Sequence, residues 1–215
     1  MKKTVLAVLV IGLLMFGMVG MVNATIINID ADGNADMTDI STTFSGVTLS
    51  ATGTGFGGTN DGKVYAVDPL IHGEPFNAST GSMVFGHSGS FASLWQGWSS
   101  IQLRADFGVL TDFVSLDIIS NDSSDAGWLK AFATDGTLLG QYTTSWMSTS
   151  NFETASLNSS SSNIAYIIAG GLNGSSIGLD NLNYSADPIP EPSTFLLLGA
   201  GLAGLGFFAR RRKQA

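Results

Sequence analysis

The sequence predicts an all-β protein: a jelly-roll β-sandwich ectodomain, flanked by a signal peptide and a single short C-terminal transmembrane helix. Three observations between Thr25 and Asp187 favour this fold. Short apolar runs recur there, clusters of Gly, Ser, Asn and Asp separate them, and no stretch shows the period of an α-helix. Many short antiparallel strands at this spacing are typical of a sandwich.

Residues 1–24 have the three parts of a secretory signal peptide. Lys2 and Lys3 precede an apolar run, and Val22-Asn23-Ala24 places small or modest residues at the positions that a signal peptidase reads. We therefore expect cleavage before Thr25, although the run is also long enough for an uncleaved anchor.

The ectodomain is expected to span residues 25–186. Val114, Leu116 and Ile118 alternate with polar residues, as in a strand with one buried face. Asp135-Gly136 predicts a two-residue hairpin between strands 128–134 and 137–142, in which both turn residues have positive φ. The polar stretch 143–163 fits either a long loop or weak edge strands. The other expected strands are 25–29, 47–51, 63–67, 82–85, 100–107, 163–169 and 177–184.

The charge of this region limits its partners. Six of the nine cations lie in the two ends of the chain. Between residues 25 and 187, Lys63, Arg104 and Lys130 face sixteen carboxylates, a formal charge of −13. Such a surface repels nucleic acid and attracts divalent cations. The chain has no cysteine, so its core must be stable without disulfides.

Residues 187–215 read as a membrane-sorting segment. A linker with three prolines (187–194) precedes an apolar stretch (195–209) and a basic tail (210–215). Fifteen helical residues span about 22 Å, which is short for a bilayer core of about 30 Å. The cations should stay on the cytoplasmic side, because moving them across the membrane is costly.

The motif Pro190, Glu191, Pro192, the Gly-rich apolar stretch and the cluster Arg210, Arg211, Arg212 resemble the PEP-CTERM sorting signal of Gram-negative bacteria. The resemblance implies export through the inner membrane, transient anchoring by the C-terminal helix, and processing near the motif by an exosortase-type enzyme. The mature protein would then be secreted or held at the cell surface. A simple C-terminal anchor after a proline-containing linker is the alternative.

A second, looser resemblance concerns the ectodomain. The segments 27–30, 44–50 and 177–184 are similar to the opening and closing strands of exported PEP-CTERM ectodomains, which look like carbohydrate-binding jelly rolls of the galactose-binding-like kind. The resemblance implies a fold more strongly than a ligand.

Acidic residues near the first strand form a pattern close to a calcium loop. Oxygen-bearing side chains alternate from Asn28 to Asp39 with Gly33 at the sixth position, but Asp replaces the usual final Glu and no helices flank the loop. A solvated acidic loop is the plainer interpretation. The jelly-roll resemblance implies a third, a structural Ca²⁺ held by Asp180 with Asp30 or Asp32.

All four tryptophans, Trp95, Trp98, Trp128 and Trp146, are candidates for contact with a sugar, and Trp95 and Trp98 are the preferred ligand residues. Trp95 and Trp98 lie in a Gly/Ser-rich stretch, where an indole could stack on the apolar face of a sugar. The alternative is that one or both lie in the core, and that Trp128 is packed within a strand.

Catalysis has little support in the sequence. Its two histidines, His72 and His87, have no metal-binding spacing, and no local pattern selects a pair of carboxylates. We therefore expect no enzyme but an exported envelope or matrix protein with a structural or carbohydrate-binding role, in contact with exopolysaccharide or biofilm. The rival hypothesis is a secreted hydrolase that acts on glycans.

Overall fold

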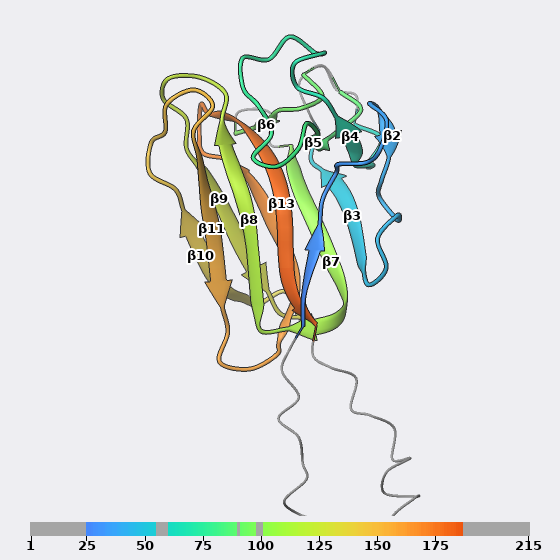
Figure 1. Ribbon diagram of the computed structural model, residues 1–215. Helices are drawn as coiled ribbons and strands as arrows, with labels where there is room; N and C mark the ends of the chain where they lie inside the picture. Colours follow the sequence, from blue (N-terminus) through green and yellow to red (C-terminus); the bar gives the residue numbers. More distant parts are fainter. Residues whose placement is uncertain (1–24, 55–59, 90, 98–100, 187–215) are drawn as a thin grey trace, which may run out of the picture. The chain divides into compact units, whose positions relative to one another are not determined.

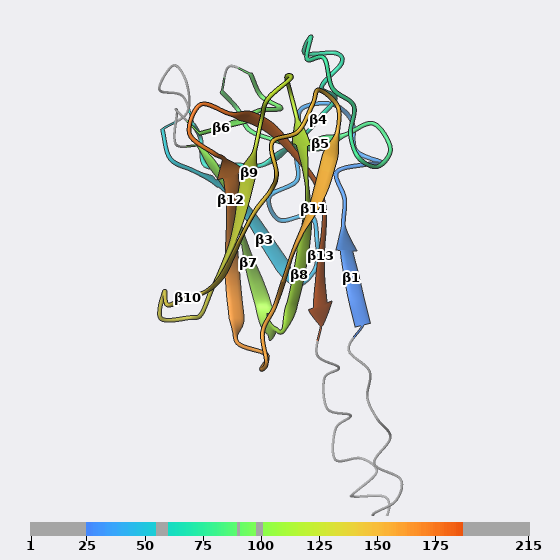
Figure 2. The same ribbon diagram turned by 90° about the vertical axis from the view of Figure 1, so that its left-hand side faces the viewer.

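Two β-sheets face each other in the computed structural model, which describes residues 25–54, 60–89, 91–97 and 101–186 (Figures 1 and 2). The described residues form strands, turns and loops without an α-helix, so the all-β prediction is confirmed. Accordingly, none of this part of the chain is a helix that could cross a membrane. The predicted signal peptide 1–24, apolar helix 195–209 and basic tail 210–215 lie outside the described residues and stay predictions.

One sheet has eight strands and the other has five. In the eight-stranded sheet the order is β11-β8-β13-β5-β4-β2, and β1 and β6 also pair with β13. The five-stranded sheet has the order β10-β9-β12-β7-β3. The strands are β1 (Thr25–Ile29), β2 (Thr38–Asp39), β3 (Val47–Thr52), β4 (Tyr65–Val67), β5 (Val84–Gly86), β6 (Trp95–Gln96), β7 (Gln102–Thr111), β8 (Phe113–Ser120), β9 (Gly127–Phe132), β10 (Leu138–Thr143), β11 (Phe152–Asn158), β12 (Ile164–Gly171) and β13 (Ser176–Ala186).

The first and last strands are neighbours. β1 pairs antiparallel with β13, so that Thr25 lies opposite Ala186 (Figure 1). The described chain therefore enters and leaves the sandwich at one end. The loop from β12 to β13, residues 172–175, lies at the opposite end.

The core lies between the inner faces of the sheets. On β9, Leu129 and Ala131 are buried, while Trp128, Lys130 and Phe132, which alternate with them, are partly exposed, as the period of a strand requires. The alternation predicted from Val114, Leu116 and Ile118 is weaker in the structure than in the sequence. Ser115, Asp117 and Ser120 of β8 are also buried. The loop before β5 lies over this face, where Ser79 Oγ donates to Asp117 and Phe76 belongs to the same buried cluster as Ile119.

The predicted hairpin at Asp135-Gly136 is present, but its turn differs from the expected one. The amide of Gly136 donates to the carbonyl of Ala133, and that of Ala133 donates to the carbonyl of Thr137. Only Gly136 has positive φ, at 84°. The connection is thus a three-residue loop in which the glycine follows a β-turn, so a two-residue turn with two positive φ values was the wrong type.

The polar stretch after β10 contains an edge strand, β11, and a link between the sheets. The hydroxyl of Tyr142 on β10 donates to Glu153 on β11 at 2.6 Å, and Ser145 Oγ donates to the other carboxylate oxygen at 2.7 Å. These bonds join the edge strands of the two sheets, and lower the pKa of Glu153 by stabilising its charged form.

Candidate functional site

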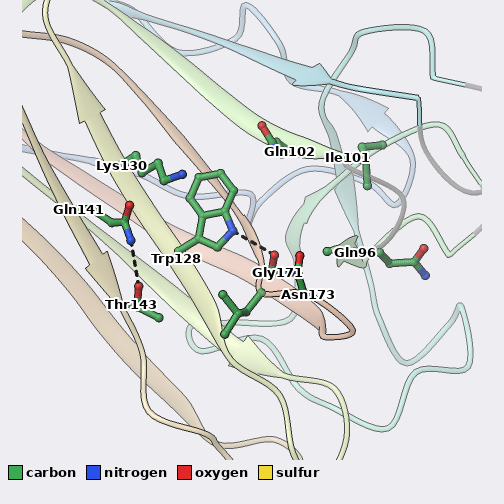
Figure 3. A pocket seen from close by; sticks show the side chains of 11 residues that line it. Gln96, Ile101, Gln102, Trp128, Lys130, Gln141, Thr143, Gly171 and Asn173 are labelled. Atoms are coloured by element: carbon green, nitrogen blue, oxygen red, sulfur yellow. Dashed lines mark hydrogen bonds between the residues drawn. The ribbon is translucent and has the colours of Figure 1, made fainter. Parts of the chain in front are cut away.

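A pocket of about 320 Å³ lies on the outer face of the five-stranded sheet, at the end near the β12–β13 loop (Figure 3). Trp128 has the largest side chain in its lining, and we name this pocket the indole pocket. It is lined by Gln96, Gly97, Ile101, Gln102, Trp128, Lys130, Gln141, Thr143, Gly171, Leu172 and Asn173.

Strand register brings these side chains together. Trp128 and Lys130 project from the outer face of β9, and in the neighbouring strand β10 their partners are Thr143 and Gln141. On the other side, Trp128 pairs with Gly170 of β12. Cross-strand partners on one face have Cβ atoms about 5 Å apart, so three adjacent strands supply one continuous lining.

Two glycines of β12 lie beside the indole. A Cβ atom on Gly170 would lie 3.4 Å from Trp128 Cζ2, and one on Gly171 would collide with the carbonyl oxygens of Ser175 and Trp95 at 2.6 and 2.8 Å. The carbonyl of Gly171 also accepts a 3.0 Å hydrogen bond from Trp128 Nε1 (Figure 3). The backbone at Gly171 therefore fixes the ring.

Neutral donors and acceptors, one aromatic ring and one cation form the chemistry of the pocket. The amides of Gln102, Gln141 and Asn173 can both donate and accept, and Lys130 Nζ lies 4.4 Å from the centroid of the Trp128 ring. None of the described lining residues is an Asp, Glu, His or Cys. This set can orient a hydroxyl-rich ligand, but it offers no acid, base or nucleophile pair of the usual kinds.

Further aromatic side chains continue along the same face. Phe132 and Tyr166 stack with centroids 4.9 Å apart and planes 9° apart, and Arg104 lies over the Tyr166 ring at 3.8 Å. Phe132 follows Trp128 by four residues on one strand, which is about 13 Å. The face thus presents a strip of rings that could contact an extended chain.

Trp95, the first predicted ligand residue, lies in the core. Trp95 on β6 is fully buried, donates from Nε1 to the carbonyl of Phe85 at 2.8 Å and packs edge-on against His87. It has no face open to a sugar, in contrast to the prediction. Trp98 lies outside the described residues. Trp128, one of the four tryptophans considered for a sugar and alternatively expected to be packed in its strand, is partly exposed on the outer face. The alternation of its strand was visible in the sequence. The sequence did not show which face of that strand would be exposed.

Asp30 and Asp180, two of the three predicted metal residues, lie together in a second region. We name it the polar cluster, and it consists of Asn28, Asp30, Ser79, Thr80, Asp117, Asp180, Asn181 and Asn183. Asp180 lies directly opposite Asp117 in the β13–β8 ladder, and both are buried. The Thr80 hydroxyl lies 2.8 Å from an oxygen of Asp30 and 3.2 Å from one of Asp180. The structure thus brings Asp30 and Asp180 to a shared partner.

The donors around Asp180 leave little room for a metal ion. Its Oδ2 accepts from the amides and hydroxyls of Ser79 and Thr80, at 2.9 to 3.2 Å. Asp32 Oδ1 accepts from the amides of Ser82 and Met83. Within the described residues no three His, Cys, Asp or Glu side chains are grouped to hold a metal. The side chains as placed do not form a ready Ca²⁺ site, and the site remains a prediction.

Burial raises the pKa of Asp180 from 3.8 to about 6, and the nearby charge of Asp30 adds to the shift. The hydrogen bonds from Ser79, Thr80 and Asn181 act in the opposite direction.

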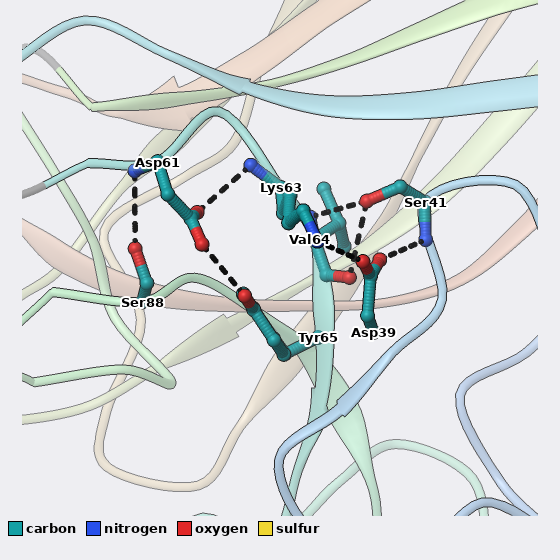
Figure 4. Close-up of polar contacts among 7 residues, drawn as sticks. All are labelled: Asp39, Ser41, Asp61, Lys63, Val64, Tyr65 and Ser88. Carbon is teal, nitrogen blue, oxygen red and sulfur yellow. Dashed lines mark hydrogen bonds and ion pairs between the residues drawn. The ribbon is translucent and has the colours of Figure 1, made fainter.

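The remaining acidic residues of the predicted calcium loop have separate partners. Asp36 contacts His72, and Asp39 forms a 2.7 Å ion pair with Lys63 (Figure 4). The hydrogen bond and charge of Lys63, with hydrogen bonds from Ser41, lower the pKa of Asp39 to about 2. These carboxylates do not converge on one centre, which agrees with an acidic loop tied to its neighbours.

The chain resembles several solved carbohydrate-binding modules. The CBM22-1 xylan-binding domain of Paenibacillus barcinonensis Xyn10C matches with a TM-score of 0.43 and 10% identity, over 77% of this chain and 97% of that one. CBM29_1, a family 29 carbohydrate-binding module from Piromyces equi, matches with a TM-score of 0.38 and 11% identity, over 79% and 95%. No curated protein matches the sequence.

The C-terminal segment has a match in a protein-family model. The model describes the PEP-CTERM protein-sorting motif and covers residues 188–213, which include Pro190, Glu191, Pro192 and Arg210 to Arg212. The match confirms the resemblance seen in the sequence, although these residues lie outside the described part of the structure. The chain therefore carries a PEP-CTERM sorting motif after its β-sandwich domain.

Proposed function

We propose that this chain is an exported protein, sorted by its C-terminal motif, whose β-sandwich binds glycan through the indole pocket. The observation that carries the proposal is the composition of that pocket, in which a partly exposed indole lies among amide side chains on the outer face of a sheet. An indole can contact the apolar face of a sugar ring, while amides exchange hydrogen bonds with its hydroxyl groups.

The pocket supports binding rather than hydrolysis. A glycosidase generally needs two carboxyl groups on either side of the scissile bond. The described lining contains no carboxyl group, and its only ionisable side chain is that of Lys130. We infer a structural or carbohydrate-binding component of the cell envelope or exopolysaccharide matrix, and no enzyme.

Trp128→Ala is expected to weaken glycan binding by at least about tenfold. Tenfold corresponds to ~1.4 kcal/mol, about what burying half of a large aromatic side chain contributes. Isothermal titration calorimetry with the glycan that binds best on an oligosaccharide panel would measure the loss. Gln141→Ala, which leaves the indole in place, should give a smaller loss in the same direction.

Trp146 provides the matched control for this experiment. It is 61% exposed and lies outside the lining of the indole pocket, so Trp146→Ala should leave the affinity unchanged. An equal loss in both tryptophan variants, or no glycan bound by the wild-type protein, would contradict the proposed site. Thermal unfolding of each variant verifies that the domain remains folded.

Glu191→Ala is expected to stop C-terminal processing. A signal peptidase and an exosortase-type enzyme should together leave a wild-type protein that begins at Thr25 and ends near Pro190, released from the inner membrane. The variant should keep residues 195–215 and remain in the membrane fraction. Intact mass and fractionation in the native host measure both properties. A wild-type product that still carries the tail would instead make it a permanent anchor.

A further inference from the structure

The three cations of the β-sandwich differ in their partners. Lys63 is paired with Asp39 at 2.7 Å (Figure 4), and Arg104 forms two hydrogen bonds with Asp106, at 2.8 and 2.5 Å. Lys130 forms no ion pair with any carboxylate in the described part of the chain. It is thus the one cation in this part whose charge no carboxylate neutralises directly.

Lys130 places its positive charge inside the indole pocket. Its Nζ lies over the ring of Trp128, inside the indole pocket, and the described lining contains no carboxylate (Figure 3). The rest of the domain is strongly acidic, with a formal charge of −13 between residues 25 and 187. The pocket therefore offers a local positive charge on a surface that otherwise repels anions.

We propose that the indole pocket selects an acidic saccharide, namely a hexuronic acid unit within a polysaccharide chain. The uronate carboxylate accepts a charge-assisted hydrogen bond from Lys130, the sugar ring contacts Trp128, and its hydroxyl groups bond to the glutamine amides. This inference rests on the proposed function of the pocket and names its ligand class.

The negative charge of the whole domain does not prevent an acidic chain from binding at Lys130. At an ionic strength of about 0.15 M, charges more than about 8 Å away are largely screened, whereas a contact between Lys130 and a carboxylate is not. An acidic chain can therefore bind where it meets the lysine, although it is repelled by the carboxylates elsewhere on the domain. Lowering the salt should weaken binding of an acidic chain, since it extends the reach of that repulsion.

The test compares ligands that differ only in charge. Hexuronate oligomers of galacturonic, glucuronic, mannuronic and guluronic acid are each titrated beside their carboxyl-reduced, neutral counterparts, in 0.15 M salt. At least one acidic oligomer should bind the wild-type protein about tenfold more tightly than its neutral counterpart. Lys130→Gln should remove this preference while keeping the neutral affinity within about twofold, and Lys130→Arg should retain it.

Lys63→Gln is the matched control, because it removes a cation outside the pocket and changes the net charge equally. If it removes the preference as Lys130→Gln does, overall charge is responsible and the proposal fails. If the wild-type protein binds acidic and neutral oligomers equally, the acidic selectivity fails but glycan binding stands. If it binds neither, and Trp128→Ala changes nothing, the proposed function fails with it.

Discussion

Trp95→Ala is expected to lower the free energy of unfolding by about 4 kcal/mol. Replacing a buried Trp or Phe with Ala typically costs about 3–5 kcal/mol, because the lost apolar contacts are followed by a cavity that the surroundings only partly fill. Trp95 is fully buried between β13 and the neighbouring loops, and its Nε1 bonds to the carbonyl of Phe85. Urea unfolding followed by circular dichroism would measure the loss.

Two further variants separate the causes of this loss. Trp95→Phe keeps most of the apolar volume but removes the bond to Phe85, so it should cost less, about 1–2 kcal/mol. Trp146→Ala removes a tryptophan that is 61% exposed and should stay within about 0.5 kcal/mol of the wild type. A small effect of Trp95→Ala would contradict its place in the core and reopen its predicted role as a ligand residue.

The tryptophans show what the sequence could and could not predict. Trp128 lies in a clear alternating pattern with Leu129 and Lys130, so its strand and its shared face with Lys130 were readable. Which face would be outside depends on packing against a distant sheet, and no local pattern carries that information. Trp95 lies in a Gly/Ser-rich stretch typical of an exposed loop, yet its pairing with Ile177 places it in the core.

Pairing between distant strands also determines which carboxylates lie together in the fold. Asp180 and Asp30 were linked in advance only through the jelly-roll resemblance, since 150 residues separate them. The partner that the resemblance did not suggest is Asp117, because it occupies an apparently outward position in an alternating strand. The loop before β5 covers this position, where Ser79 Oγ donates to Asp117 Oδ2. A register shift in β13 after Asp180 accompanies a second contact, in which Asn181 Nδ2 donates to the same oxygen at 3.0 Å.

Asp180 is expected to make the free energy of unfolding depend strongly on pH. Its pKa is raised to about 6 in the folded protein, against 3.8 without burial, so the folded state binds a proton more tightly between these values. The stability from protonated Asp180 is therefore fully present below about pH 4 and is lost as the pH rises through 6. A shift of this size corresponds to about 3 kcal/mol.

The free energy of unfolding of the wild type and of Asp180→Asn, measured from pH 4 to pH 7 in chelator, would reveal this loss. Asparagine cannot ionise, so the wild type should lose about 2 kcal/mol relative to the variant over this range, most of the full effect. The fixed cost of the substitution, including the amide of Asn181 that would lose its acceptor, cancels in the comparison. Glu153→Gln should change with the opposite sign, because hydrogen bonds from Tyr142 and Ser145 lower the pKa of Glu153.

Parallel curves for the wild type and Asp180→Asn would mean that Asp180 does not carry the raised pKa, and that its charge is compensated in the fold. The same two proteins then test the predicted calcium. An ion that binds only the folded state stabilises it by mass action, so Ca²⁺ at pH 7 should raise the melting temperature of the wild type alone. Equal melting temperatures with calcium and with chelator would remove the metal site, and would leave the polar cluster as a set of buried carboxylates held by hydroxyl and amide donors.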